Sequence, residues 1–203
     1  MVSASGDEQD RKRLRLVVGL GNPGAKYEKT RHNIGFDCLN LLSKKWSGPI
    51  PMTKYEGQLS KVAIQGVEVL LLWPMTFMNA SGRCVQQVVR FYKIDPSDVL
   101  VVCDDLALPI GKLRVRRSGS AGGQKGLADI LRVLGTQDVP RLRIGIDPCP
   151  PQWETADYVL SRFRSEERET VELALERAAE AISCWVDRGI DHCMNIYNRG
   201  DVL

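Results

Sequence analysis

The sequence LRLVVGLGNPGAKYEKTRH occupies residues 14–32 and joins an apolar segment to a turn rich in glycine. The apolar part contains two adjacent valines, which is typical of a buried β-strand, and it breaks at the glycines and proline of residues 19–24. Glycines permit a tight turn and a close approach of a ligand to the backbone. Because open α/β folds bind ligands at the carboxyl ends of their strands, we expect a functional site here, with Asn22 and His32 as its polar groups.

Gly19, Gly21 and Gly24 also satisfy the G-x-G-x-x-G pattern of dinucleotide-binding turns. A true fingerprint opens directly into a helix with an apolar face and meets an acidic ribose ligand about twenty residues later. Here the turn continues into the charged residues 26–33, and the later position falls in the largely apolar segment Cys38–Leu42. The pattern therefore gives only weak support to a nucleotide site.

The chain has 203 residues and a formal net charge of +3, which suits a single domain with a hydrophobic core. No run of about eighteen apolar residues is present, so we expect no membrane span. Six scattered cysteines without a C-x-x-C pair favour reduced structural thiols, and two distant histidines argue against a metal centre. We expect residues 1–13 to be a polar, disordered lead-in without a secretory signal, and residues 14–203 to form the domain.

Apolar periodicity and turn residues divide the rest of the chain into helices and strands. Helical spacing predicts four helices, at residues 34–46, 82–92, 127–134 and 165–188. Short apolar or alternating runs predict further strands, at residues 62–64, 67–73, 99–102, 112–116 and 141–144. The run at 99–102 is apolar throughout, as expected for a strand that is covered on both faces.

Two carboxylates, Asp104 and Asp105, follow directly after this buried strand. If the sheet is parallel there, the carboxyl end of the strand lies at the same edge as the turn rich in glycine. Asp104 is then a candidate hydrogen-bond partner for His32.

Basic residues dominate the region from Gly111 to Ile146, where eight of them stand against two acidic residues. Strand alternation places several of them on one face, and two more lie in the following loop. We expect this set to contact RNA, although a merely solvated sheet face is the alternative. The predicted RNA-binding residues are Lys112, Arg114, Arg116, Arg117, Lys125, Arg141 and Arg143.

Four segments in this order resemble the bacterial-type peptidyl-tRNA hydrolase family, and the resemblance covers residues 14–198. They are Gly19–Gly24 with Thr30–Asn33, Pro74–Gly82, Asp104–Pro109, and Gly122–Ile130 followed by Arg141–Ile146. The resemblance implies one α/β domain with a mixed twisted sheet flanked by helices. It also implies an enzyme without metal or cofactor that cleaves the ester between a peptide and tRNA.

In the matching positions, the resemblance makes His32 the general base and Asp104 the residue that orients its imidazole. Asn22 and Asn79 would hold the substrate. These roles suit the residue types, because a histidine fixed by a carboxylate can take a proton from water.

The sequence departs from the family pattern at Gln124-Lys125, where the hydrolases usually carry His-Asn. Gln124 can still donate a hydrogen bond. The cation of Lys125 is expected to oppose formation of an imidazolium nearby and so to reduce hydrolysis.

In its overall similarity and in this change, the sequence resembles a plant branch of the family, the chloroplast group II intron splicing facilitator. The branch implies a protein of the chloroplast stroma, made with a transit peptide, that acts with a CRM-domain partner protein and group II intron RNA rather than as an enzyme. The alternative is an active peptidyl-tRNA hydrolase with tRNA as its partner. For the splicing interpretation, Met194, Ile196 and Tyr197 are the candidate partner-binding residues, unless they pack against the long helix.

Overall fold

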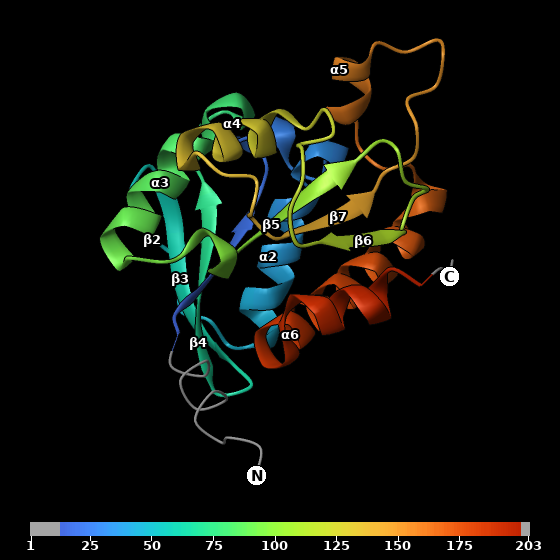
Figure 1. The fold of residues 1–203 in the computed structure, drawn as a ribbon. Helices are drawn as coiled ribbons and strands as arrows, with labels where there is room; N and C mark the ends of the chain where they lie inside the picture. Colours follow the sequence, from blue (N-terminus) through green and yellow to red (C-terminus); the bar gives the residue numbers. More distant parts are fainter. Residues whose placement is uncertain (1–12, 200–203) are drawn as a thin grey trace.

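A computed structural model describes residues 13–199. The expected disordered lead-in of residues 1–13 therefore lies, apart from Arg13, outside the described residues. A single seven-stranded sheet has the order β2-β3-β4-β1-β5-β7-β6 (Figure 1). Its strands are β1 (Arg15–Gly19), β2 (Met52–Lys54), β3 (Gly57–Ile64), β4 (Val67–Pro74), β5 (Val99–Asp105), β6 (Leu113–Arg116) and β7 (Arg141–Gly145).

The sheet is mixed, as the resemblance implied. The central strands β4, β1, β5 and β7 run parallel, whereas β2, β3 and β6 pair antiparallel at the two sides. All residues of β1 and β5 are buried. Both strands are covered on two faces, which explains their continuous apolar runs.

Helices cover the two faces of the sheet (Figure 1). Helices α2 (Ile34–Lys45) and α6 (Arg168–Tyr197) share one core with Val17, whereas α3 (Ser81–Tyr92) and α4 (Lys125–Leu134) share another with Leu16 and Val18. Alternate residues of β1 therefore enter opposite cores, as strand geometry requires. The α/β prediction is confirmed.

The glycines at the end of β1 serve close packing of helix on strand. A Cβ atom at Gly19 would lie 2.4 Å from the carbonyl oxygen of Gly35, and one at Gly35 would lie 2.5 Å from Leu20 N. Only glycine lets α2 approach the strand so closely. The turn therefore packs against the start of α2, which begins two residues after His32.

The last helix continues beyond its predicted end. Gly189 has a φ of 79° and bends the chain, but a further helical segment follows as far as Tyr197. Met194 and Tyr197 pack partly buried against the core, and burial raises the pKa of Tyr197 to about 12. Ile196 is 49% exposed. Packing thus accounts for two of the three residues that were expected to bind a partner.

Candidate active site

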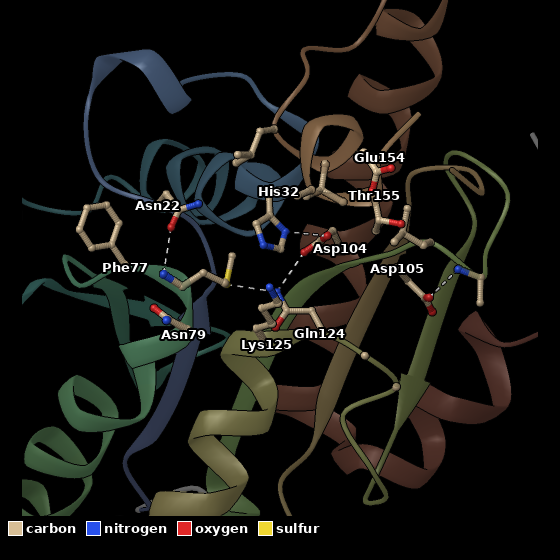
Figure 2. Close-up of a pocket in the computed structure, with 18 residues that line it drawn as sticks. Asn22, His32, Phe77, Asn79, Asp104, Asp105, Gln124, Lys125, Glu154 and Thr155 are labelled. Carbon is tan, nitrogen blue, oxygen red and sulfur yellow. Dashed lines mark hydrogen bonds and ion pairs between the residues drawn. The ribbon is translucent and has the colours of Figure 1, made fainter. Parts of the chain in front are cut away.

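A cleft of about 650 Å³ opens at the carboxyl ends of β1 and β5 (Figure 2). All four residues that the resemblance made catalytic line it, although they come from distant parts of the chain. The lining includes Asn22, His32, Asn79 and Asp104. The expectation that the turn and the end of β5 share one edge of the sheet is met.

His32 and Asp104 are in direct contact. His32 lies in a short 3₁₀ helix (Arg31–Asn33) before α2, and its Nδ1 is 2.8 Å from Oδ2 of Asp104 in β5. Asp104 is buried. A carboxylate at this distance accepts a hydrogen bond from Nδ1–H, which leaves Nε2 free to accept a proton from a reactant.

Asn22 is fixed by three hydrogen bonds. Its Oδ1 accepts a hydrogen bond of 2.9 Å from the backbone N–H of Met78. Its backbone exchanges two hydrogen bonds of 2.9 Å with the side chain of Asn33. Because Oδ1 is occupied, the side chain has its Nδ2 donor left for a ligand in the cleft.

Asn79 follows Met78 in the short 3₁₀ helix Met78–Ala80 and is exposed in the cleft. The Met78 N–H therefore joins the element that carries Asn79 to the turn that carries Asn22. The two amides lie on neighbouring, hydrogen-bonded segments.

Gln124 and Lys125 occupy different environments. Gln124 is 7% exposed and is the N-cap of α4, where its Oε1 accepts a hydrogen bond of 2.7 Å from Leu127 N. Its Nε2 donates to Oδ1 of Asp104 over 3.1 Å (Figure 2). Lys125 also lines the cleft but is exposed to solvent, so water screens its charge, which weakens the expected effect on His32.

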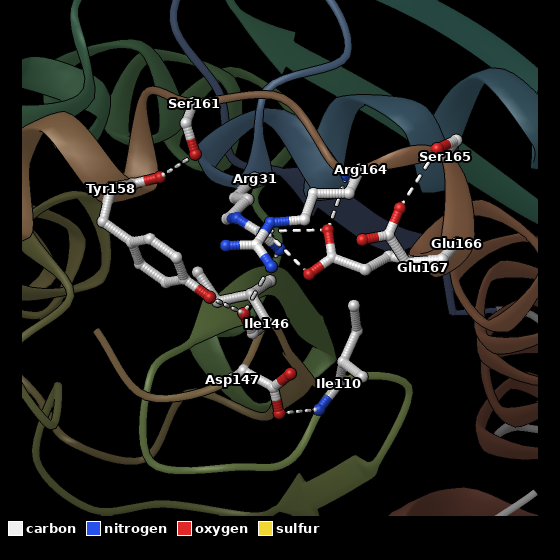
Figure 3. A network of polar contacts seen from close by, with 10 residues as sticks. All are labelled: Arg31, Ile110, Ile146, Asp147, Tyr158, Ser161, Arg164, Ser165, Glu166 and Glu167. Atoms are coloured by element: carbon white, nitrogen blue, oxygen red, sulfur yellow. Dashed lines mark hydrogen bonds and ion pairs between the residues drawn. The ribbon is translucent and has the colours of Figure 1, made fainter. Parts of the chain in front are cut away.

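A buried arginine anchors the segment that carries His32 (Figure 3). Arg31 is 2% exposed, and its Nη2 lies 2.7 Å and 2.9 Å from the two carboxylate oxygens of Glu167. Its guanidinium carbon lies 4.6 Å from the ring centroid of Tyr158 and 4.8 Å from that of Phe163. The neighbour of the candidate base is thus tied to residues 158–167.

The basic face is smaller than the sequence predicted. Arg141 is 2% exposed and donates to the backbone carbonyls of Val139, Gly119 and Ser120, at 2.7, 2.8 and 3.2 Å. The prediction that it binds RNA is wrong, because the loop after β6 covers it and uses its donors. Burial lowers the pKa of Arg141.

The other predicted cations fall into two groups. Arg143 is partly buried, with its Nε 3.0 Å from Asp105 Oδ2, and Arg117 forms an ion pair with Asp191. Both are thus engaged within the protein. Lys112 and Arg114 are half-buried and Arg116 is exposed along the edge strand β6, so with Lys125 they are the cations placed to meet a ligand.

Sequence reasoning missed one wall of the cleft. The helix α5 (Thr155–Val159) contributes Thr155, Ala156 and Val159, and it follows a loop without clear periodicity. Phe77, 62% exposed, and Met78 also line the cleft. Both belong to the segment Pro74–Gly82 that carries Asn79. Their large apolar side chains next to Asn79 could have predicted that they line the cleft.

No cysteine lines the cleft. All six are free, and burial raises the pKa of Cys103, beside Asp104, above its ordinary value. Burial also raises the pKa of Cys38 to about 12, so these thiols stay protonated at neutral pH.

Within residues 13–199, no cluster of three metal-ligating side chains occurs and no helix is long and apolar enough to cross a membrane.

Known proteins are similar to this chain over nearly its whole length. The crystal structure of peptidyl-tRNA hydrolase from Acinetobacter baumannii is 34% identical, with a TM-score of 0.86, and the match covers 94% of this chain and 96% of that one. Peptidyl-tRNA hydrolase of Rhodopirellula baltica is 51% identical, over 91% of this chain and 97% of that protein. The protein of that name from Elusimicrobium minutum is 43% identical, over 92% and 100%. The family model "Peptidyl-tRNA hydrolase" matches residues 16–202.

The chain belongs to the peptidyl-tRNA hydrolase family.

These matches overturn the interpretation as a chloroplast splicing cofactor. The relatives named above are bacterial proteins that carry the name peptidyl-tRNA hydrolase, and that name does not point to splicing, a chloroplast or a ribonucleoprotein. The interpretation gave too much weight to Gln124-Lys125. In the structure Gln124 still donates a hydrogen bond to Asp104, and the cation of Lys125 lies in solvent.

Proposed function

We propose that this protein is an active peptidyl-tRNA hydrolase, which cleaves the ester between a peptide and the 3′ end of tRNA. The observation that carries the proposal is the 2.8 Å contact between His32 Nδ1 and Asp104 Oδ2 inside the cleft. The names of the bacterial relatives, at 43% to 51% identity, support the same substrate.

In the proposed reaction, the oxygen of a water molecule attacks the ester carbonyl carbon while His32 Nε2 accepts a proton from that water. Asp104 keeps the other ring proton on Nδ1, and its charge stabilises the imidazolium that forms. The imidazolium then gives its proton to the 3′ oxygen of the ribose as the bond between carbon and that oxygen breaks. The products are a peptide with a free carboxyl group and tRNA with a free 3′ hydroxyl.

Asn22 is suited to stabilise the carbonyl oxygen as negative charge develops on it. The hydrogen bond from Met78 N–H fixes its Oδ1, so Nδ2 is held toward the cleft before substrate arrives. A donor that is already oriented costs no reorganisation during the reaction.

A test of the proposal measures release of peptide from peptidyl-tRNA by the wild-type protein and by Asn22→Asp. The aspartate keeps an acceptor for Met78 N–H but loses the donor, so kcat is expected to fall by about a hundredfold. Asn40→Asp is the matched control, because Asn40 is an exposed residue of α2 outside the cleft. It should keep wild-type kcat. A wild-type protein without turnover would refute the proposal.

The row of cations on β6 is suited to the phosphates of the tRNA. Register pairs Leu113 with Ile144 near the carboxyl end of β7, so Lys112 lies near the cleft edge and Arg116 farther along the strand. A tRNA whose 3′ end lies in the cleft can therefore place the phosphates of its adjoining duplex along this row of cations. The exposed ring of Phe77 at the cleft offers a surface on which an unpaired base can stack.

Arg116→Glu is expected to raise KM for peptidyl-tRNA by roughly tenfold at low salt and to flatten its dependence on salt, with kcat little changed. Lys44→Glu makes the same charge change at an exposed position of α2, away from β6, and serves as the control. Steady-state kinetics at several salt concentrations measure both. Equal changes in KM for the two variants would exclude β6 as the tRNA surface.

A further inference from the structure

The side-chain amide of Gln124 makes contacts with both of its ends. Its Oε1 accepts the hydrogen bond from Leu127 N, which satisfies a backbone donor at the start of α4. Its Nε2 donates to Oδ1 of Asp104 and lies 3.2 Å from Sδ of Met78. The side chain is buried, so no solvent replaces these contacts.

The cap determines which way the amide faces. If the amide were turned over, its oxygen would face the oxygen of Asp104 and its NH₂ would face the N–H of Leu127. Both pairs would be repulsive. The N-terminus of α4 therefore holds the Nε2 donor toward the carboxylate.

The two oxygens of Asp104 thus have separate partners. Oδ2 is 2.8 Å from His32 Nδ1, and Oδ1 is 3.1 Å from Gln124 Nε2. A carboxylate with one partner can rotate about its Cβ–Cγ bond, whereas partners on both oxygens fix its plane. A hydrogen bond from Gln124 also favours the ionised form of the carboxylate, because it is a bond to a charged acceptor.

We propose that Gln124 is a positioning residue that locks the Asp104 carboxylate, and through it the Nδ1–H tautomer of His32. This inference rests on the proposed hydrolase function. It assigns a task to the position at which the chain departs from the His-Asn of the family pattern. Since Gln124 acts through Asp104, its loss should lower kcat and leave substrate binding nearly unchanged.

Two substitutions separate this role from simple capping of α4. Gln124→Met keeps the approximate length of the side chain and removes both hydrogen bonds. Gln124→Glu keeps an acceptor for Leu127 N–H, replaces the donor to Asp104 by an oxygen and adds a negative charge beside that carboxylate. Both variants are expected to lose about tenfold to a hundredfold in kcat, with KM for peptidyl-tRNA within about twofold of wild type. Gln124→His can accept a hydrogen bond from Leu127 N–H and donate one to Asp104, so it should retain most of the wild-type kcat.

A nitrogen NMR measurement of the imidazole tests the same contact without substrate. In the wild type, His32 should show the tautomer with the proton on Nδ1, and both Gln124→Met and Gln124→Glu should shift its population toward Nε2–H. His192, which is exposed on α6, provides an internal reference that should not change.

Asp129→Ala controls for damage to the neighbouring helices. Asp129 Oδ2 accepts a hydrogen bond of 2.8 Å from Gly82 N at the start of α3. The variant therefore loses a similar bond outside the cleft, and its kcat should stay at the wild-type value.

Wild-type kcat or an unchanged His32 tautomer in Gln124→Met would overturn the assignment of Gln124. A rise in KM alone would overturn it as well. If the wild-type protein does not cleave peptidyl-tRNA, the proposed function fails, but the NMR measurement still decides whether Gln124 sets the tautomer of His32.

Discussion

Asp104→Asn is expected to lower kcat by about three to four orders of magnitude, because it forces His32 into the wrong tautomer. The amide of Gln124 already donates to Oδ1 of residue 104. An asparagine there must turn its oxygen toward Gln124 and its NH₂ toward His32 Nδ1. The ring nitrogen that faces this NH₂ has to be an acceptor, so the proton moves to Nε2, which can then no longer take one from water.

Steady-state kinetics with peptidyl-tRNA measure this loss, and far-ultraviolet circular dichroism checks that the variant is folded. Asp95→Asn is the control, since Asp95 caps a short 3₁₀ helix with a bond of 2.9 Å from Ser97 N and lies outside the cleft lining. Asparagine is an equally good cap, so this variant should behave as wild type. An Asp104→Asn variant with more than a tenth of the wild-type kcat would contradict the proposed role of the carboxylate.

The pairing of His32 with Asp104 could be predicted from sequence, because Asp104 stands at the carboxyl end of one buried strand and His32 follows another. Parallel strands end at one edge of a sheet, so the ends of β1 and β5 had to lie close together. The apolar runs of both strands carried this information, and the contact of 2.8 Å agrees with it. Nothing in the runs themselves indicated that Gln124 would reach the other oxygen of Asp104.

The solvent exposure of the basic side chains could not be predicted from strand alternation. Alternation correctly placed Arg141 and Arg143 on the same face as Arg114 and Arg116, as the β6–β7 register has it. Whether that face meets solvent depends on how the loop of residues 117–124 folds over it. Loop conformation arises from contacts between distant residues, such as those of Arg141 with the carbonyls of Gly119 and Ser120.

The functional misassignment has a similar origin. From residue types alone, the change to Gln124-Lys125 predicts a retained hydrogen-bond donor and an adverse charge. Geometry decides both effects, since Gln124 points inward to Asp104 whereas Lys125 is exposed. A substitution in a loop therefore says little about activity until the directions of its side chains are known.

Breaking the ion pair of the buried Arg31 with the partly buried Glu167 is expected to lower the free energy of unfolding by about 3 kcal/mol. Arg31→Met leaves the carboxylate of Glu167 without its cation, although it keeps the hydrogen bond from Arg164 N–H. Glu167→Met leaves a guanidinium inside the protein between Tyr158 and Phe163. In each case a charge that has lost its ion-pair partner remains in a position that is buried, for Arg31, or partly buried, for Glu167. The double variant removes both charges, so it should be less destabilised than the sum of the two single variants.

Urea denaturation of the wild type, both single variants and the double variant measures this coupling. The exposed pair of Lys45 and Glu176, with an N–O distance of 3.0 Å, provides a matched cycle on the surface. Its substitutions to methionine should change stability by less than about 1 kcal/mol, because water screens the charges. Equal losses of unfolding free energy for the Arg31–Glu167 and Lys45–Glu176 pairs would contradict the importance of burial. Since Arg31 precedes His32 and its backbone N–H bonds to Ser161 O at 2.9 Å, the destabilised variants should also lose turnover at temperatures below their unfolding transition.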